Sequence, residues 1–296
     1  MSTYNCEPSL TDSQVLDFCK TGYLILEGVV PEEINRRTKE WLDVFHEAEK
    51  GRQTSQLYEE DWFMETVVRN PEAAGAIRSL LGPDYQEPQW MTFFRGEGTS
   101  PPGQWHIDGG YSHGPQLNLL KWFYLPSDTP DDLGPTEFVP GSHHLLNQVR
   151  FMAHYDGIRH RWKASGPAGS ILITVYPLWH RRALCTRDQV RYMVTSTVHR
   201  TSPPRRDWVV EPNFDFGLAN YQLESPRFGE QFRSSTDTAR MFCWLCGKHD
   251  VFKAGDGPGW PRPRNMNEPW FDVPEEIATL GAQLGKGRPT GEGIGV

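Results

Sequence analysis

His106 and Asp108, separated by Ile107, form a pair of side chains that could bind a metal ion. Along a β-strand, residues i and i+2 point to the same face, so the imidazole and the carboxylate converge if this stretch is extended. A second histidine on a neighbouring strand would complete a triad of two imidazoles and one carboxylate, which leaves open positions on a non-haem iron ion. His180 is the candidate, because it follows an apolar run at residues 170–175 that predicts a strand.

The same His-x-Asp spacing occurs a second time in the chain, at His154 and Asp156. The spacing alone is a weak signal, because short motifs of this kind arise by chance. The second pair has no strand pattern around it and stands beside the basic residues 159–161. We therefore expect it to lie in an exposed loop and not in the site.

The five cysteines do not indicate a disulfide framework in a chain of this length. Cys243 and Cys246 have CxxC spacing, and His249 follows them. A closed zinc site requires four ligands and usually a second pair, which is missing, while a redox motif requires a βαβ context that the pattern does not show. The sequence therefore predicts that these two thiols are packing residues.

Helical patterns dominate the first part of the chain. Thr11 and Gln14 have the spacing of a capping box, which predicts the start of a helix. Apolar residues recur at helical spacing over residues 31–45, and a further helix is expected at residues 71–81. A short strand is expected at residues 23–26, where four apolar residues follow one another.

From residue 89 the pattern changes to short apolar runs separated by Gly, Pro and Asp, which is typical of a β-sandwich or small barrel. The expected strands are residues 90–94, 104–107, 117–124, 136–139, 170–175 and 190–198. The predicted fold class is therefore mainly β with flanking helices (α+β). We expect a single catalytic domain over residues 1–296, with a helical N-terminal layer at about 1–88, the core that carries the site at 89–200, and an irregular C-terminal layer at 201–296.

Composition and charge exclude some classes of partner. No apolar run approaches the ~20 residues that a membrane helix needs, so no membrane partner is expected. The net charge of -8 argues against nucleic acid, because phosphate contacts reward a basic surface. Neither end of the chain carries a targeting signal, so a cytoplasmic location is the expectation. Basic residues cluster at 159–163 and 181–206, as a solvated surface or as a binding place for an anion.

Three stretches of the chain resemble the phytanoyl-CoA dioxygenase family of 2-oxoglutarate oxygenases. They are Trp105–Asp108, the apolar run at residues 117–125, and Gly134–His143, which reads GPTEFVPGSH. The beginning of the chain, from Leu10 to Val30, is similar to the opening helix and strand of that family. The resemblance covers residues 10–200 and not the remainder.

The resemblance implies a double-stranded β-helix core of the cupin or jelly-roll type that uses Fe(II), 2-oxoglutarate and dioxygen to oxidise an unactivated C–H bond. By the same matching, His106, Asp108 and His180 fall on the iron ligands. Arg191 falls on the arginine that holds the far carboxylate of 2-oxoglutarate, and Arg95 on a position where a basic residue often lies near that carboxylate. A planar guanidinium binds a carboxylate through two parallel hydrogen bonds and stays charged, which independently favours Arg191.

The chain departs from the family pattern in two places. Glutamine commonly stands between the first two ligands, whereas Ile107 cannot hydrogen-bond the inner carboxylate of the co-substrate. The small residues and asparagine that usually follow the distal histidine are replaced by Arg181–Cys185. Another side chain is therefore expected to bind the inner carboxylate, and one wall of the pocket is expected to differ.

The predicted function is an Fe(II)- and 2-oxoglutarate-dependent dioxygenase that hydroxylates a small-molecule metabolite or lipid-like substrate and releases succinate and CO2. Desaturation, ring closure, epimerisation and endoperoxide formation begin with the same hydrogen abstraction and stay open. So do two alternatives: a non-redox cupin-like protein that binds a metal or small molecule, and a zinc-dependent hydrolase with the same three ligands. Aromatic residues near the site could line a pocket for a flat substrate: Trp105, Tyr111, Trp122, Tyr124, Tyr176 and Trp179.

Overall fold

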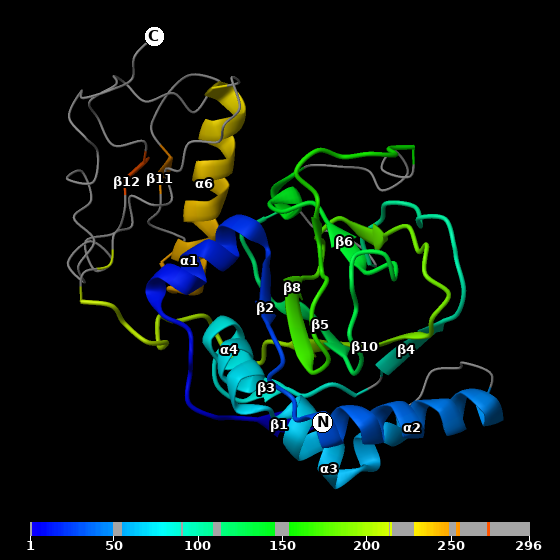
Figure 1. Ribbon diagram of the computed structural model, residues 1–296. Coiled ribbons are helices and arrows are strands. Elements are labelled where there is room, and N and C mark those ends of the chain that lie inside the picture. The colour runs from blue at the N-terminus through cyan, green and yellow to red at the C-terminus, as the bar shows by residue number, and fades with distance from the viewer. Residues whose placement is uncertain are drawn as a thin grey trace.

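A computed structural model describes residues 2–49, 55–89, 91–108, 114–145, 154–212, 214, 228–248, 253–254 and 271–272 (Figure 1). No helix within these ranges is both long and apolar enough to cross a lipid bilayer. Tyr111 and His249 lie outside the described residues, as do Trp90 and most of the stretch predicted to form a C-terminal layer. The division of the domain into three layers stays a prediction.

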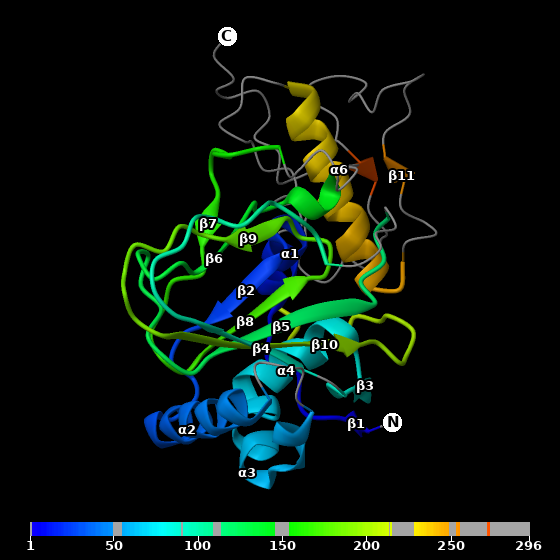
Figure 2. The same cartoon turned by 90° about the vertical axis from the view of Figure 1, so that its right-hand side faces the viewer.

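The larger sheet is antiparallel and joins strands from the N-terminal part of the chain with strands that come later in the sequence (Figures 1 and 2). Its strand order is β1-β3-β10-β5-β8-β2, and β4 also pairs with β10. The strands are β1 (Thr3–Tyr4), β2 (Tyr23–Leu26), β3 (Tyr85–Gln86), β4 (Met91–Gly96), β5 (Leu119–Leu125), β8 (Ser170–Val175) and β10 (Arg191–His199). The segment that the sequence assigns to a helical layer therefore contributes β1, β2 and β3 to this sheet.

A smaller sheet faces the larger one across the barrel interior (Figure 2). It has the order β7-β6-β9, and its strands are β6 (Thr136–Phe138), β7 (Trp162–Lys163) and β9 (His180–Arg182). A two-stranded pair, β11 (Lys253–Ala254) with β12 (Phe271–Asp272), lies apart from both. The prediction of a mainly β core with flanking helices is confirmed.

Side-chain alternation divides the larger sheet into an inner and an outer face. On β5, Trp122 and Tyr124 belong to the apolar core, while Lys121 and Phe123 line the cavity between the sheets. On β4, Phe94 likewise lines that cavity, whereas its neighbours in sequence point to the other side. The outer face therefore meets helices, and the inner face is left for a ligand.

Helices on the outer face are held by polar and aromatic contacts. They are α2 (Glu32–Glu49), a 3-10 turn at Gln56–Glu59, α3 (Asp61–Phe63), a π turn at Met64–Val68, and α4 (Pro71–Leu81). The Tyr124 hydroxyl donates to Asn35 Oδ1 over 2.6 Å, and the rings of Phe45 and Phe93 meet edge to face. These contacts fix α2 against β4 and β5, so the inner faces of those strands are supported from behind.

Helix α1 (Asp12–Thr21) has the predicted capping box, in which Thr11 and Gln14 satisfy each other's backbone N–H groups. Its other end is closed by Gly22, whose φ of 82° is the left-handed conformation that glycine tolerates. Helix α6 (Phe228–Leu245) packs beside α1 (Figure 1). The buried carboxylate of Asp12 accepts hydrogen bonds from Arg206 and from the Trp208 indole, which attaches the start of α1 to the chain beyond β10.

Candidate metal centre

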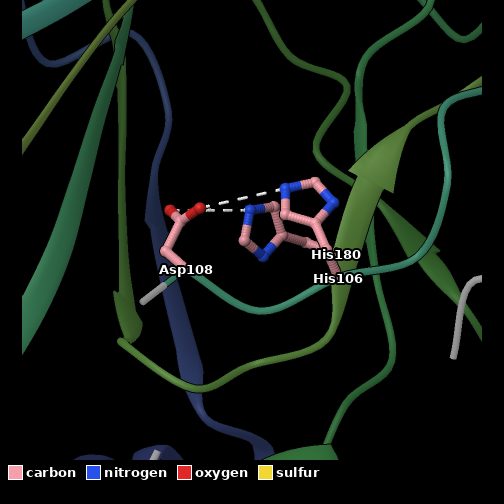
Figure 3. A group of neighbouring side chains, drawn as sticks. All are labelled: His106, Asp108 and His180. Carbon is pink, nitrogen blue, oxygen red and sulfur yellow. Dashed lines mark ion pairs between the residues drawn. The ribbon is translucent and has the colours of Figure 1, made fainter. Parts of the chain in front are cut away.

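The side chains of His106, Asp108 and His180 converge on one point of the cavity, as Figure 3 shows. One ligand atom from each residue lies within 4.8 Å of the other two. Asp108 Oδ1 is 3.8 Å from His106 Nε2, and Asp108 Oδ2 is 3.7 Å from His180 Nε2. Among the described residues this is the only group of three or more potential ligands that lie this close together.

Backbone pairing holds the two histidines next to each other. His180 begins β9, and His106 forms an isolated antiparallel bridge with it, so that the centroids of their rings are 4.3 Å apart. The strand predicted at residues 104–107 is reduced to this bridge, since only His106 forms a β-bridge there. Asp108 lies in a bend two residues further on, and its carboxylate still points toward the two imidazoles (Figure 3).

Each imidazole is oriented by a backbone carbonyl on its Nδ1 side. His106 Nδ1 lies 2.9 Å from the carbonyl oxygen of Gln104, and His180 Nδ1 lies 2.9 Å from that of Leu178. A carbonyl accepts only, so each Nδ1 carries the proton and donates it. Both Nε2 atoms therefore direct a lone pair toward Asp108, as metal-binding imidazoles do.

The charges of the site suit a cation. Burial lowers the pKa of His180 to about 4, although Asp108 opposes this shift, so His180 is a neutral ligand at physiological pH. Burial alone would raise the pKa of Asp108, but the positive charge of His180 when protonated and of Lys121 outweigh it and leave this pKa below its ordinary value. The donor set is thus two imidazole nitrogens and one carboxylate, which fits Fe(II) and also catalytic zinc.

The triad opens into a cavity of about 680 Å³ between the two sheets. Its apolar lining comes mainly from Phe94, Trp105, Phe123 and Met193. Its polar lining comprises the triad, Gln104, two threonines and four cations: Thr136, Thr195, Lys121, Arg181, Arg182 and Arg191. A cavity of this size that combines an apolar wall with converging polar groups is typical of a site for a small organic ligand.

Arg191, at the start of β10, is a buried cation without a carboxylate partner among the described residues. One of its terminal nitrogens donates to Thr136 Oγ1 over 3.3 Å, and its Nε has no hydrogen-bond partner. Burial, and then the charge of Arg182, lower the pKa of Arg191 to about 10, so the group is still protonated at neutral pH. A buried cation that lacks a counter-ion favours the binding of an anion in the same cavity.

The structure does not bring Arg95 to the cavity. Arg95 Nε donates to Asp43 of α2 over 3.0 Å, and another of its nitrogens donates to Glu97 over 2.9 Å. The reason is alternation along β4: Phe94 faces the cavity, so the next residue must face α2. Because Arg95 binds Asp43 and Glu97 on the outer side of the sheet, it is not available to a ligand at the triad.

The other cations of the basic runs are mostly paired. Arg161 and Arg181 both bind the buried carboxylate of Glu137, and Arg187 binds Asp132 at the surface. Within the described part of the chain, Arg191 is thus unusual in being buried without such a pair. Many of the basic residues at 159–163 and 181–206 are thus paired or exposed, as expected for a solvated surface. Arg191 is the one that fits the alternative expectation of an anion-binding site.

The remaining candidates lie away from the triad. His154 and Asp156 are exposed, as expected, although the Trp105 indole donates to the backbone carbonyl of Asp156 over 3.1 Å. Cys243 and Cys246 are buried thiols at the end of α6, and burial raises the pKa of Cys243 to about 12, as for a packing residue. Of the aromatic residues proposed to line a pocket, Trp105 lines the triad's cavity, while Trp122, Tyr124, Tyr176 and Trp179 do not.

Lys121 is a site residue that sequence reasoning missed. Its Nζ donates to Asp108 Oδ2 over 2.7 Å, and its side chain is only 12% exposed. The sequence did contain a signal, because Lys121 is the charged residue in the middle of a largely apolar predicted strand. A cation placed there must be paired or must serve a ligand.

Comparison with known proteins agrees with this geometry. The family model for phytanoyl-CoA dioxygenase matches residues 18–181, which include the whole triad. No curated protein sequence matches the chain.

Several solved structures share the fold. HygX from Streptomyces hygroscopicus, with nickel and 2-oxoglutarate bound, has a TM-score of 0.54 at 15% identity and covers 66% of this chain and 88% of its own. The carbocyclase SnoK from nogalamycin biosynthesis has a TM-score of 0.54 at 18% identity over 76% and 98% of the two chains. EctD from S. alaskensis, with bound Fe, has a TM-score of 0.52 at 16% identity over 68% and 80%. The predicted double-stranded β-helix is thereby confirmed.

Proposed function

Because the chain belongs to the phytanoyl-CoA dioxygenase family of non-haem Fe(II)/2-oxoglutarate-dependent oxygenases, we propose that it hydroxylates a C–H bond of a small, largely apolar metabolite or lipid-like molecule. His106, Asp108 and His180 hold the iron in this proposal, and Arg191 binds the far carboxylate of 2-oxoglutarate. Bound together, Fe(II) and 2-oxoglutarate activate dioxygen for C–H oxidation, with release of succinate and CO2.

One observation carries the proposal: a triad of potential metal ligands and a buried guanidinium, with no carboxylate partner among the described residues, line the same cavity. The triad alone would serve zinc hydrolysis as well as iron chemistry. A hydrolase has no need of a second charged group for a dicarboxylate, whereas a 2-oxoglutarate enzyme must bind a co-substrate with a carboxylate at each end. Arg191 therefore favours the oxygenase.

The residues of the chain contribute positioning and electrostatics. Both imidazoles present Nε2 because their Nδ1 protons are held by carbonyls of the backbone. Arg191 offers a planar, permanently charged fork that fixes a carboxylate in one orientation. The surrounding apolar side chains would exclude water from a bound co-substrate, which strengthens these interactions.

The cavity wall supports an apolar substrate. Phe94 lines the cavity and is 48% exposed, so its ring is available at the opening to a ligand that enters. Trp105 and Phe123 continue the apolar surface inside, and the guanidinium of Arg181 lies 4.6 Å from the centroid of the Trp105 ring. The latter contact keeps the indole in place and leaves the rest of its surface to the cavity.

Succinate release tests the activity. Metal-free protein is incubated in air with 2-oxoglutarate, with and without Fe(II) and with Zn(II) as the alternative metal. Iron-dependent succinate formation is expected even before the substrate is known, as slow uncoupled turnover. Metal-loaded protein that forms neither succinate nor a complex with 2-oxoglutarate would contradict the proposal and favour the hydrolase or the non-redox binding protein.

A metabolite library scored by mass change then tests the reaction. A gain of one oxygen is the expected result, since it identifies hydroxylation. A loss of two hydrogens would identify desaturation or ring closure, and an unchanged mass with altered retention would identify epimerisation. Either of these outcomes would replace hydroxylation while keeping the iron and the co-substrate.

A further inference from the structure

Lys121 brings a positive charge to the centre of the site. It extends from β5 into the cavity, and its ammonium group lies 2.7 Å from Asp108 Oδ2. In the sheet register it stands between Thr174 of β8 and Thr197 of β10, both buried. Directly opposed residues of antiparallel strands share a face, so Lys121 belongs to a polar row across the inner wall.

A lysine in this place is costly unless it serves an anion. Its only acidic partner among the described residues is Asp108, the same carboxylate that would hold the metal. An ammonium group has three donors, and one of them is directed to Asp108. With a divalent ion at the triad, Lys121 would be close to a second cation, and repulsion between them would weaken metal binding unless further negative charge enters.

The co-substrate supplies that charge, and it has two ends. Arg191 stands at the beginning of β10, whereas Lys121 is in register with Thr197 near the end of the same strand. The two cations therefore approach the cavity from opposite ends of its inner wall. A dicarboxylate carries negative charge at two separate places, and Arg191 can serve only one of them.

The position between the first two ligands cannot serve the inner carboxylate. Ile107 is 8% exposed and packs with Trp105 and Trp179 in an apolar cluster, and it does not line the cavity. Alternation is the cause, because Ile107 points away from the face that His106 and Asp108 share.

Two other cations line the cavity, and both are engaged. Arg181 forms an ion pair with Glu137 and stacks on an indole. Arg182 is exposed and donates to the carbonyl of Pro101 over 2.9 Å. Lys121 is thus the cation that touches the metal-binding carboxylate and is enclosed by the wall.

We propose that Lys121 binds the inner, metal-proximal carboxylate of 2-oxoglutarate, and so replaces a side chain between the two ligands of the His-x-Asp pair. The proposal rests on the function proposed above. The Lys121 ammonium already contacts Asp108, so it would be within reach of a carboxylate that binds the metal next to Asp108. Lys121 then has opposite effects on the two ligands: it disfavours the bare metal ion and favours the metal with its anionic co-substrate.

The test uses Lys121→Met and Lys121→Gln, the second of which keeps a hydrogen-bond donor to Asp108 but no charge. Fe(II) affinity is measured first, and 2-oxoglutarate is then titrated anaerobically at saturating iron through its metal-to-ligand absorption band. Removal of the charge should leave iron binding equal or tighter and weaken 2-oxoglutarate binding by at least about ten-fold. Lys121→Arg, which keeps the charge, should restore part of the affinity.

A ligand comparison separates the two ends of the co-substrate. The compound 2-oxopentanoate has the same carbon chain and inner carboxylate but lacks the far carboxylate. Neutral residues at position 121 should weaken its binding as much as they weaken 2-oxoglutarate, while Arg191→Ala should weaken 2-oxoglutarate far more than 2-oxopentanoate. Lys163→Met is the control, because it removes a lysine that pairs with Asp131 outside the cavity and should change neither affinity.

The outcomes are distinct. If the neutral variants weaken iron binding and leave 2-oxoglutarate unchanged at saturating iron, Lys121 only positions Asp108 and the proposal fails. Should Lys121→Met not fold, Lys121→Gln decides by the same criterion: an unchanged 2-oxoglutarate affinity in this variant overturns the proposal. Wild-type protein without any 2-oxoglutarate band would instead refute the proposed function.

Discussion

His106 and His180 form a backbone bridge in which each N–H group donates to the other residue's carbonyl, over 3.0 and 2.9 Å respectively. Residues that exchange both hydrogen bonds in this way stand directly opposite each other in an antiparallel pair, and their side chains lie on the same face. The bridge thus brings together two imidazoles that are far apart in sequence. A slip of one residue would turn one of them to the opposite face.

Metal binding should depend on this group and not on the second His-x-Asp pair. Asp108→Ala removes the only carboxylate of the triad, so Fe(II) affinity should fall by more than the roughly 10–100-fold typical of losing an outer partner of a metal ligand. Equilibrium titration of the metal-free protein under anaerobic conditions measures the change.

His154→Ala is the matched control, because it removes a histidine of the same motif from an exposed stretch. Its iron affinity should equal that of the wild type. If His154→Ala lost iron and Asp108→Ala retained it, the metal would belong to the pair of His154 and Asp156 and the proposed site would be wrong.

Arg191→Ala should weaken 2-oxoglutarate binding while iron binding survives. Removing one member of a buried charge pair costs roughly 2–5 kcal/mol, which corresponds to tens-fold to a few thousand-fold in affinity. Arg191→Lys should recover only part of this, because a point charge lacks the two-pronged geometry of guanidinium. The anaerobic titration of the iron complex with 2-oxoglutarate measures both variants.

Arg95→Ala serves as the control for Arg191, since Arg95 binds Asp43 and Glu97 outside the cavity. It should leave the co-substrate midpoint unchanged. A shift in Arg95→Ala as large as that in Arg191→Ala would mean that long-range charge, and not contact, controls binding.

Features that depend on nearby residues could be predicted from the sequence. The capping box of Thr11 and Gln14 and the helix at residues 71–81 appear where the pattern placed them, because caps and helical periodicity are local. The strand at residues 170–175 also has the predicted bounds. The shared face of His106 and Asp108 follows from the two-residue period of an extended chain.

Features that depend on long-range register could not be predicted. Whether Arg95 or Phe94 faces the cavity is decided by how β4 pairs with β10 and where α2 packs, and neither is written in the local pattern. The contact between Lys121 and Asp108 joins two segments whose approach depends on closure of the barrel. That no carboxylate among the described residues pairs with Arg191 likewise depends on the folded cavity and not on the basic run around it.

Gly22→Ala should destabilise the protein by at least about 1 kcal/mol. Gly22 adopts a φ of 82°, and a Cβ there would lie 2.6 Å from the Nδ1 atom of His143. Gly157→Ala is the control, because a Cβ at Gly157 meets nothing within 4 Å. Denaturant unfolding measures both, and equal stabilities of the two variants would show that the left-handed turn after α1 is not needed.

Cys243→Ala combined with Cys246→Ala should leave iron content and 2-oxoglutarate binding unchanged. Both thiols are buried, Cys243 in α6 and Cys246 just after its end, and burial raises their pKa values, so neither is a ready thiolate ligand. The double variant should lose stability by about 0.5–3 kcal/mol per site through lost packing. Stoichiometric zinc in the wild type that disappears from the double variant would contradict the packing role.

Acid should destabilise the metal-free protein partly through His180. Burial lowers its pKa to about 4, against roughly 6.5 in an unfolded chain. Between these values the unfolded state binds the proton and the folded state does not, so the free energy of unfolding falls as the pH falls from about 6.5 to about 4. A shift of this size corresponds to about 3 kcal/mol at most. Because His180→Gln has no group that titrates there, the difference in unfolding free energy, wild type minus variant, should decrease across this window in urea unfolding at a series of pH values. A difference that stays constant would show that His180 is not held neutral by the fold.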